Sequence, residues 1–125
     1  MRLIAKLLGV DKPLTTIEAS DDTFDELRSS RRVVIVDFWA TWCGPCRRFS
    51  PVFERVATQL KHLEDLRFVA VDVDACPKAA AALQISSVPS VVAFVDGAPV
   101  TRTGPSSAAQ LTDFVERHRG MAGLT

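Results

Sequence analysis

The sequence predicts a single α/β domain in which helices cover a mixed β-sheet. Apolar runs of strand length alternate along the chain with segments of helical periodicity. One run, residues 33–40, is almost wholly apolar, as expected of a central strand covered on both faces. Near the end, two short runs are joined through Asp96-Gly97, which indicates a β-hairpin. No linker or repeat divides the 125 residues, and with 47% of them hydrophobic they suffice for one core.

The first elements are short. Residues 15–18 are a candidate for a brief strand. Ser20 or Asp21 can then cap a helix, since both side chains accept hydrogen bonds from free backbone N–H groups. Phe24 and Leu27 lie three residues apart and form the buried face of that helix.

The middle of the chain alternates between helix and strand. After the apolar run, a helix is predicted over residues 43–63, and Pro51 inside it should cause a kink because proline lacks a backbone N–H. Residues 67–74 form the next predicted strand. Pro77 suits the first turn of a helix that continues through the alanines to residue 83.

The last elements are the hairpin and a helix. The hairpin strands are predicted at residues 90–95 and 100–103. Ser106 is predicted to cap the final helix, whose amphipathic pattern buries Leu111, Phe114 and Val115.

Chemistry is concentrated in Trp42-Cys43-Gly44-Pro45-Cys46, where the central strand is predicted to end and a helix to begin. A CxxC in this setting, in a chain with three cysteines, indicates a dithiol that cycles with a disulfide. Cys43 is expected at the helix start, where unpaired N–H groups and the helix dipole favour a thiolate. Cys46, one turn further in, should be more buried and should resolve rather than attack. Pro45 fits an early helical position, Gly44 allows close approach of a partner's backbone, and Trp42 is expected to shield one side of the sulfurs.

Neighbouring residues bear on the same pair. Arg47 and Arg48 add positive charge that also favours a thiolate. A zinc site is the alternative use of a CxxC, but such a site needs about four ligands. The other cysteine and histidine candidates show no ligand spacing, so we expect neither a metal nor another cofactor; they are Cys76, His62 and His118.

Residues 36–46, VDFWATWCGPC, resemble the active-site segment of the thioredoxin family. The resemblance covers roughly residues 13–119 and includes Pro51, Ser87-Val88-Pro89-Ser90, Asp96-Gly97 and Gly104. It implies the thioredoxin fold, with a central mixed five-stranded sheet flanked by four helices, and a site at the carboxyl end of a central strand. Residues 1–12 are then an N-terminal extension and residues 120–125 a C-terminal tail.

Asp37 is the one acid in the predicted central strand. Burial should raise its pKa until it can carry a proton near neutral pH. In the family, the matching aspartate transfers a proton to or from the resolving cysteine, which is the role we expect. The alternative is a carboxylate paired with a nearby cation or backbone group. Family members often place a lysine nearby, where this chain has Ala70.

Pro89 matches the family's cis proline, although a proline before a strand can also be an ordinary trans residue. In the family, this loop faces the cysteines and its backbone binds the substrate chain as an added strand. Trp39 is expected to pack beneath the site. The predicted substrate groove consists of Trp42, Gly44, Pro45, Val88, Pro89 and Gly104.

Cys76, just before Pro77, has two interpretations. It is either a regulatory thiol on the same side of the domain as Cys43 or a small residue at a helix start. We favour the second.

Charge and cysteine content limit the partners and the cellular location expected of the protein. Fifteen basic and fifteen acidic residues give zero net charge, so no strong attraction to nucleic acid or anionic membrane is expected. An odd number of cysteines with one close pair does not fit a secreted disulfide framework, which favours the cytoplasm. Residues 1–12 are amphipathic, and targeting to mitochondria is the alternative if they act as a signal. No stretch has the roughly 20 apolar residues that span a membrane.

Together these features predict a monomeric protein-disulfide reductase with a reversible Cys43/Cys46 cycle. It would donate electrons to target enzymes and contribute to cell redox homeostasis. The resemblance implies re-reduction by an NADPH-dependent thioredoxin reductase. The alternative is a docking module that binds partners through the same groove without turnover, which the presence of both cysteines disfavours.

Overall fold

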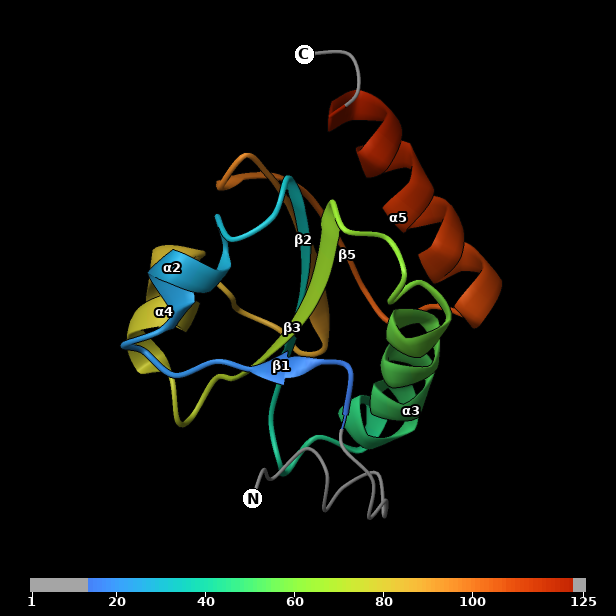
Figure 1. The fold of residues 1–125 in the computed structure, drawn as a ribbon. Helices are drawn as coiled ribbons and strands as arrows, with labels where there is room; N and C mark the ends of the chain where they lie inside the picture. The colour runs from blue at the N-terminus through green and yellow to red at the C-terminus, as the bar shows by residue number, and fades with distance from the viewer. Residues whose placement is uncertain (1–13, 123–125) are drawn as a thin grey trace.

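The computed structural model describes residues 14–122, and the predictions for residues 1–12 and for residues 123–125 lie outside them. The described chain contains four helices and five strands (Figure 1). In chain order these are β1 (Ile17–Glu18), α2 (Phe24–Leu27), β2 (Val33–Trp39), α3 (Gly44–Gln59), β3 (Leu66–Asp72), α4 (Pro77–Ala82), β4 (Ser90–Val95), β5 (Ala98–Thr103) and α5 (Ala108–Ala122).

The five strands form one mixed sheet in the order β1-β3-β2-β4-β5. β3 runs parallel to β1 and β2, whereas β4 is antiparallel to both β2 and β5. β2 lies in the middle, and all seven of its residues are buried. The predicted mixed five-stranded sheet and its central strand are therefore confirmed.

Helices cover both faces of the sheet, with α3 and α5 on one side and α2 and α4 on the other (Figure 1). Successive residues of β2 point to opposite faces. Ile35 packs in the cluster that includes Phe53 of α3, whereas Val36 packs in the cluster that includes Phe24 of α2. An apolar run is needed here because neither face of β2 meets water.

The hairpin turn explains the Asp96-Gly97 pair. Both residues have positive φ, 52° at Asp96 and 84° at Gly97, as a two-residue type I′ turn requires. A Cβ on Gly97 would also lie 3.0 Å from the Cβ of Ser29. Glycine is therefore favoured here by the backbone conformation, and a side chain would also crowd Ser29.

Of the two residues predicted to cap α2, Ser20 does so and Asp21 does not. The Ser20 hydroxyl accepts from the backbone N–H of Thr23, just before α2, and the Thr23 hydroxyl accepts from the N–H of Ser20. The Asp21 carboxylate instead accepts hydrogen bonds from the backbone N–H groups of Lys78 and Ala79, at the start of α4. Asp21 thus joins the two helices on its face of the sheet across 57 residues of sequence.

The cap of α5 is displaced by one residue. Ser107, not Ser106, accepts from the backbone N–H of Gln110, and the Gln110 side chain accepts from the N–H of Ser107. This reciprocal pair is a capping box, which satisfies two backbone donors at once. The helix then continues to Ala122, through residues 120–122 of the predicted tail.

Several strand and helix ends also differ from the prediction. α3 ends at Gln59 rather than at residue 63, because tight turns follow, with the N–H of Leu63 donating to the Leu60 carbonyl. Leu60 and Leu63 still pack against the core, which is why they follow the helical pattern. β1 begins two residues later than predicted, β3 one residue earlier and β5 two residues earlier.

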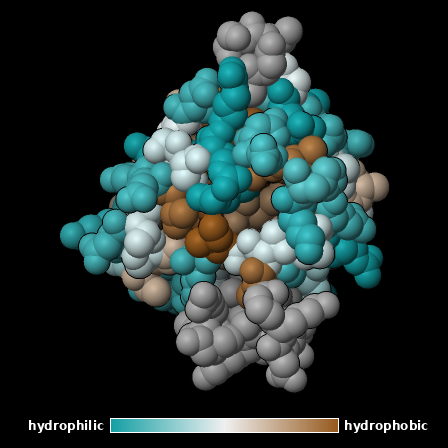
Figure 2. All heavy atoms as spheres, viewed as in Figure 1, coloured by the Kyte–Doolittle hydropathy of each residue, from teal (hydrophilic) through white to brown (hydrophobic). Residues whose placement is uncertain are grey.

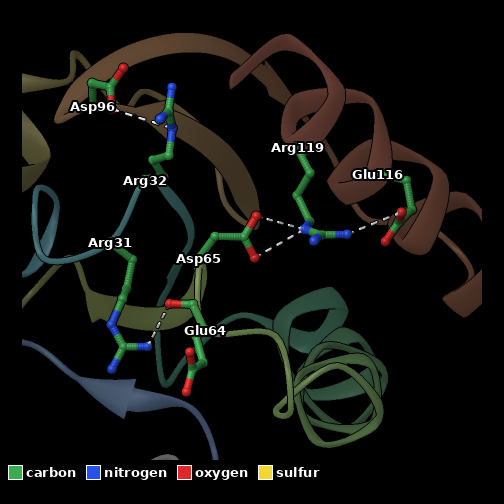
Figure 3. Close-up of polar contacts among 7 residues, drawn as sticks. All are labelled: Arg31, Arg32, Glu64, Asp65, Asp96, Glu116 and Arg119. Atoms are coloured by element: carbon green, nitrogen blue, oxygen red, sulfur yellow. Dashed lines mark hydrogen bonds and ion pairs between the residues drawn. The ribbon is translucent and has the colours of Figure 1, made fainter. Parts of the chain in front are cut away.

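An ion pair joins α5 to the loop before β3, at the end of the sheet where β2 and β3 begin. Arg119 donates to both carboxylate oxygens of Asp65, just before β3, at 3.2 and 3.1 Å, and also contacts Glu116 (Figure 3). Nearby, Arg31 donates to the Glu64 carbonyl (Figure 3).

The surface in this view is mainly hydrophilic, with a small hydrophobic area in its middle, over the β1 edge of the sheet (Figure 2). Ile17 of β1 is 36% exposed. None of the described helices is both long enough and apolar enough to cross a bilayer.

Candidate active site

The two cysteines of the CxxC lie where β2 gives way to α3. Cys43 is the N-cap of α3 and has an extended backbone, and its Sγ accepts a hydrogen bond from the Cys46 N–H at 3.1 Å. Pro45 occupies the first turn. A disulfide joins Cys43 to Cys46, with 5.2 Å between their Cα atoms. A backbone donor aimed at the Cys43 sulfur stabilises negative charge on that atom once the disulfide is reduced.

The surroundings of the two sulfurs differ. Cys43 is 5% exposed and Cys46 is fully buried, the order that the sequence predicts. The Cys43 Sγ lies 3.7 Å from the carbonyl oxygen of Val88. The Val88-Pro89 peptide bond is cis, as expected from the resemblance.

A small apolar cluster supports the pair from below. Trp39, Ala40 and Ala70 belong to one buried cluster with both cysteines, and all three are fully buried. Trp39 therefore has the structural position predicted for it.

Trp42 occupies the outer side of the site and is 67% exposed. Its indole Nε1 donates to the Asp74 carboxylate at 2.8 Å. The loop that carries Asp74 is held in turn by Asp72, whose carboxylate accepts from the backbone N–H groups of Asp74 and Ala75. Sequence reasoning missed Asp74, because nothing along the chain signals a contact across 32 residues.

Two arginines lie in the first turns of α3. Arg47 donates to the Thr41 carbonyl at 2.8 Å, across the loop that holds the cysteines. A guanidinium nitrogen of Arg48 lies 3.7 Å from where a Cβ on Gly44 would be. Positive charge is thus present beside the N-terminus of α3, as expected.

Asp37 is the buried acid of the central strand. It is fully buried, and its strand neighbours are Ala70 on β3 and Val91 on β4, neither of which offers a polar side chain. Neither carboxylate oxygen has a hydrogen-bond partner among the described residues, so the alternative of a paired carboxylate does not hold there. Burial raises the pKa of Asp37 from 3.8 to about 7.

Gly104 follows β5 directly, and Thr103 pairs with Val91 in the register of the sheet. Gly104 therefore lies at the strand end next to the Pro89 loop. A Cβ at this position would meet no atom within 4 Å, so the described chain leaves space there.

Cys76 is not part of this arrangement. It is buried in the cluster on the α2 and α4 side, and its thiol donates to the Ala19 carbonyl at 3.4 Å. Burial first, and then the carboxylates nearby, of which Asp21 and Asp72 act most, raise the pKa of the Cys76 thiol to about 11. The structural interpretation of Cys76 is therefore the better one. Among the described residues, no group of three His, Cys, Asp or Glu side chains could hold a metal ion.

Known proteins are similar to this chain in both sequence and fold. The thioredoxin family model matches residues 15–117, which is most of the chain. The chain belongs to the thioredoxin family. It is accordingly a thiol-disulfide oxidoreductase of the protein-disulfide reductase type, with Cys43 and Cys46 as its redox-active pair.

Individual relatives support this assignment. The thioredoxin of Mycolicibacterium smegmatis is 43% identical over 88 residues, which are 70% of this chain and 79% of that protein. A bifunctional thioredoxin reductase/thioredoxin of Mycobacterium leprae is 42% identical over 102 residues, 79% of this chain and 22% of that protein. Among solved structures, a mutant thioredoxin from Halobacterium salinarum superposes with a TM-score of 0.74. It is 31% identical, and the match covers 88% of this chain and 96% of that one.

Proposed function

We propose that Cys43 is the attacking nucleophile and Cys46 the resolving thiol in the reduction of protein disulfides. The observation that carries this assignment is the contact at the start of α3, where the Cys46 N–H points at the Cys43 sulfur. The slight exposure of Cys43 supports the same order, since Cys46 is fully buried. Only the outer sulfur is open to a substrate.

The cycle transfers two electrons. The Cys43 thiolate attacks one sulfur of the substrate disulfide, forms a mixed disulfide and displaces the other substrate sulfur as a thiolate, which takes a proton from water. Cys46 then loses its proton and attacks the Cys43 sulfur. The second substrate thiol leaves, and the Cys43-Cys46 disulfide remains, the state seen in the structure.

Asp37 is the proposed acceptor of the Cys46 proton. Buried Cys46 needs a base within the protein, because water does not reach it. Asp37 lies on the face of β2 that α3 covers, two residues before Trp39, which packs with Cys46. With a pKa of about 7, the carboxyl can gain and lose a proton near neutral pH.

The substrate is proposed to bind as an extended chain beside the Val88-Pro89 loop. The Val88 carbonyl next to the Cys43 sulfur and the space at Gly104 support this placement. Main-chain hydrogen bonds of this kind favour many sequences rather than one. The proposed groove consists of Trp42, Gly44, Pro45, Val88, Pro89 and Gly104.

The reducing partner is proposed to be an NADPH-dependent thioredoxin reductase. The Mycobacterium leprae relative supports this, because its name joins the two activities in one protein. We further propose a monomer that acts in the cytoplasm, donates electrons to target enzymes and contributes to cell redox homeostasis. The alternative location is mitochondrial, if residues 1–12 act in targeting.

Trapping tests the assigned roles. The Cys46→Ser variant should stop at the mixed disulfide, because a serine hydroxyl is far too basic to displace a thiol from sulfur. Partners should be recovered covalently, released by dithiothreitol, and lost when Cys43 is also replaced. Insulin reduction should disappear in Cys43→Ser. Partners that bind all forms equally would indicate a docking module instead.

A further inference from the structure

Charged side chains of opposite sign lie beside the cysteine pair. In the loop after β3, Asp74 is exposed, and its carboxylate accepts the hydrogen bond of the Trp42 indole. In the first turns of α3, Arg47 and Arg48 are exposed as well. The two arginines differ in what their guanidinium groups contact, and this difference distinguishes Arg48 from its neighbour.

Arg48 is the cation that has no partner of its own. The Arg47 guanidinium donates to the Thr41 carbonyl at 2.8 Å and so holds the loop before α3. The Arg48 side chain, in contrast, makes no hydrogen bond and no ion pair with any of the described residues. All five N–H donors of its guanidinium are therefore available to an anionic group of a bound molecule.

The Arg48 side chain extends over a residue of the proposed substrate groove. Side chains on a helix lean toward its N-terminus, so residue 48 covers the residue one turn earlier, which is Gly44. A guanidinium nitrogen of Arg48 lies 3.7 Å from the place that a Cβ on Gly44 would occupy. Gly44 follows Cys43 directly and is exposed. Because Gly44 has no side chain, nothing of this residue stands between the Arg48 guanidinium and a chain bound at Cys43.

We propose that Arg48 is a specificity-determining residue, which favours substrates with an acidic side chain two positions from the cysteine that Cys43 attacks. The inference rests on the proposed function, in which the substrate binds as an extended chain at Cys43. Every second side chain of such a chain points to the same face, so residues two positions from the substrate cysteine also face the domain. A carboxylate there can accept hydrogen bonds from the planar fork of the Arg48 guanidinium.

Peptides with an activated disulfide test this preference. Each peptide has a central cysteine joined through a disulfide to 2-thiopyridine, with glutamate, glutamine or lysine at both positions two residues away and alanine elsewhere. Attack by the Cys43 thiolate of the fully reduced protein releases thiopyridone, whose absorbance gives the rate constant. Each rate constant is divided by that of dithiothreitol with the same peptide, which removes differences in intrinsic reactivity. The glutamate peptide should react about two to five times faster than the glutamine peptide, the gain expected of an exposed ion pair, and the lysine peptide should react slowest.

Substitutions at Arg48 should change the ratio of the glutamate rate to the glutamine rate. Arg48→Gln should remove the gain, Arg48→Lys should retain part of it, and Arg48→Glu should reverse it. A change in the thiolate content of Cys43 alters the rates of all peptides by one factor, so the ratio isolates the effect of Arg48 on the substrate. Raising the salt concentration should lower the ratio in the parent protein, because exposed charges are screened.

Arg55→Gln is the matched control. Arg55 is exposed on the same helix, seven residues after Arg48, and its replacement changes the net charge by the same amount. The ratio should stay at the parent value in this variant. A loss as large as that in Arg48→Gln would show that net charge causes the preference, and would overturn the inference.

The remaining outcomes separate the inference from the proposed function. If the ratio is the same in Arg48→Gln and in the parent protein, Arg48 does not determine specificity and the inference alone is overturned. If Cys43→Ser releases thiopyridone as fast as the parent protein, the proposed role of Cys43 fails, and it does so with every peptide alike.

Discussion

Replacing Asp37 by asparagine should stabilise the oxidised protein at neutral and alkaline pH and change little near pH 4. The physical reason is the burial of the carboxyl, which raises its pKa from 3.8 to about 7 on folding. Between these two pH values the folded protein holds a proton that the unfolded chain has lost. Stability therefore falls as pH rises through that window, because the unfolded state binds fewer protons.

The size of the effect follows from the same two values. Each pH unit between 3.8 and about 7 corresponds to about 1.4 kcal/mol, so the total cost of Asp37 above pH 7 is about 4 kcal/mol. Asparagine resembles the protonated acid in size and is never charged. The gain from Asp37→Asn should accordingly grow from near zero at pH 4 to about 4 kcal/mol at pH 8.

Urea unfolding at a series of pH values measures this difference, with the disulfide kept intact in both proteins. Asp25→Asn is a matched control, because the Asp25 side chain on α2 is exposed and pairs with Arg28 at the surface. Its effect on stability should stay well below that of Asp37→Asn at pH 8, since an exposed ion pair contributes at most about 1 kcal/mol. Parallel curves for Asp37→Asn and the parent would show that the carboxyl ionises as easily in the folded protein as in the unfolded chain. The reasoning from burial would then be wrong.

Three further results are expected from the site. In the reduced protein at neutral pH, Cys43 should react with iodoacetamide faster than Cys46, because it is the outer sulfur at the start of α3; mass spectrometry of early time points checks the order. Cys76 should stay unlabelled until the protein is unfolded, since its thiol is buried and its pKa is raised to about 11; labelling of the folded protein at the rate of Cys43 would contradict this. Asp74→Ala should free the Trp42 indole and raise the KM for insulin a few-fold, because one exposed hydrogen bond contributes about 1 kcal/mol. Asp74→Asn keeps a hydrogen-bond acceptor and should therefore raise the KM less.

Much of the fold could be predicted because its signals are local. The apolar run of β2 indicates a strand covered on both faces, whatever the rest of the chain does. Asp96 and Gly97 encode their turn through backbone conformation alone. The helix start at Cys43 follows from the proline two residues later.

The errors in the fold arise where a side chain has two possible partners. Asp21 is a good cap for the nearby helix, but the start of α4 takes its carboxylate once the chain has folded. At α5, Ser106 and Ser107 are equally suited by type, and the reciprocal bond with Gln110 selects Ser107. No pattern within a few residues distinguishes these options.

The residues of the site also fall into those that the sequence reveals and those that only the structure reveals. Cys43, Cys46 and Asp37 stand out in the sequence through their spacing and because an acid is unusual in an apolar strand. Asp74 does not stand out, because an aspartate in a loop is an ordinary residue. Only its contact with Trp42 reveals it.

The burial of Asp37 both lowers the stability of the protein and supports the proposed role of its carboxylate as a base. Moving a proton from a thiol with the ordinary pKa of about 8.5 to a carboxylate with the ordinary pKa of about 3.9 is unfavourable by more than four pKa units. A carboxyl pKa of about 7 makes this difference smaller by about three units. The burial that lowers stability by about 4 kcal/mol above pH 7 therefore makes transfer of the Cys46 proton easier by the same amount. We accordingly expect the Asp37→Asn variant to be more stable at pH 8 and to reduce disulfides more slowly there. A substitution that removes the buried charge also removes the base that accepts the Cys46 proton.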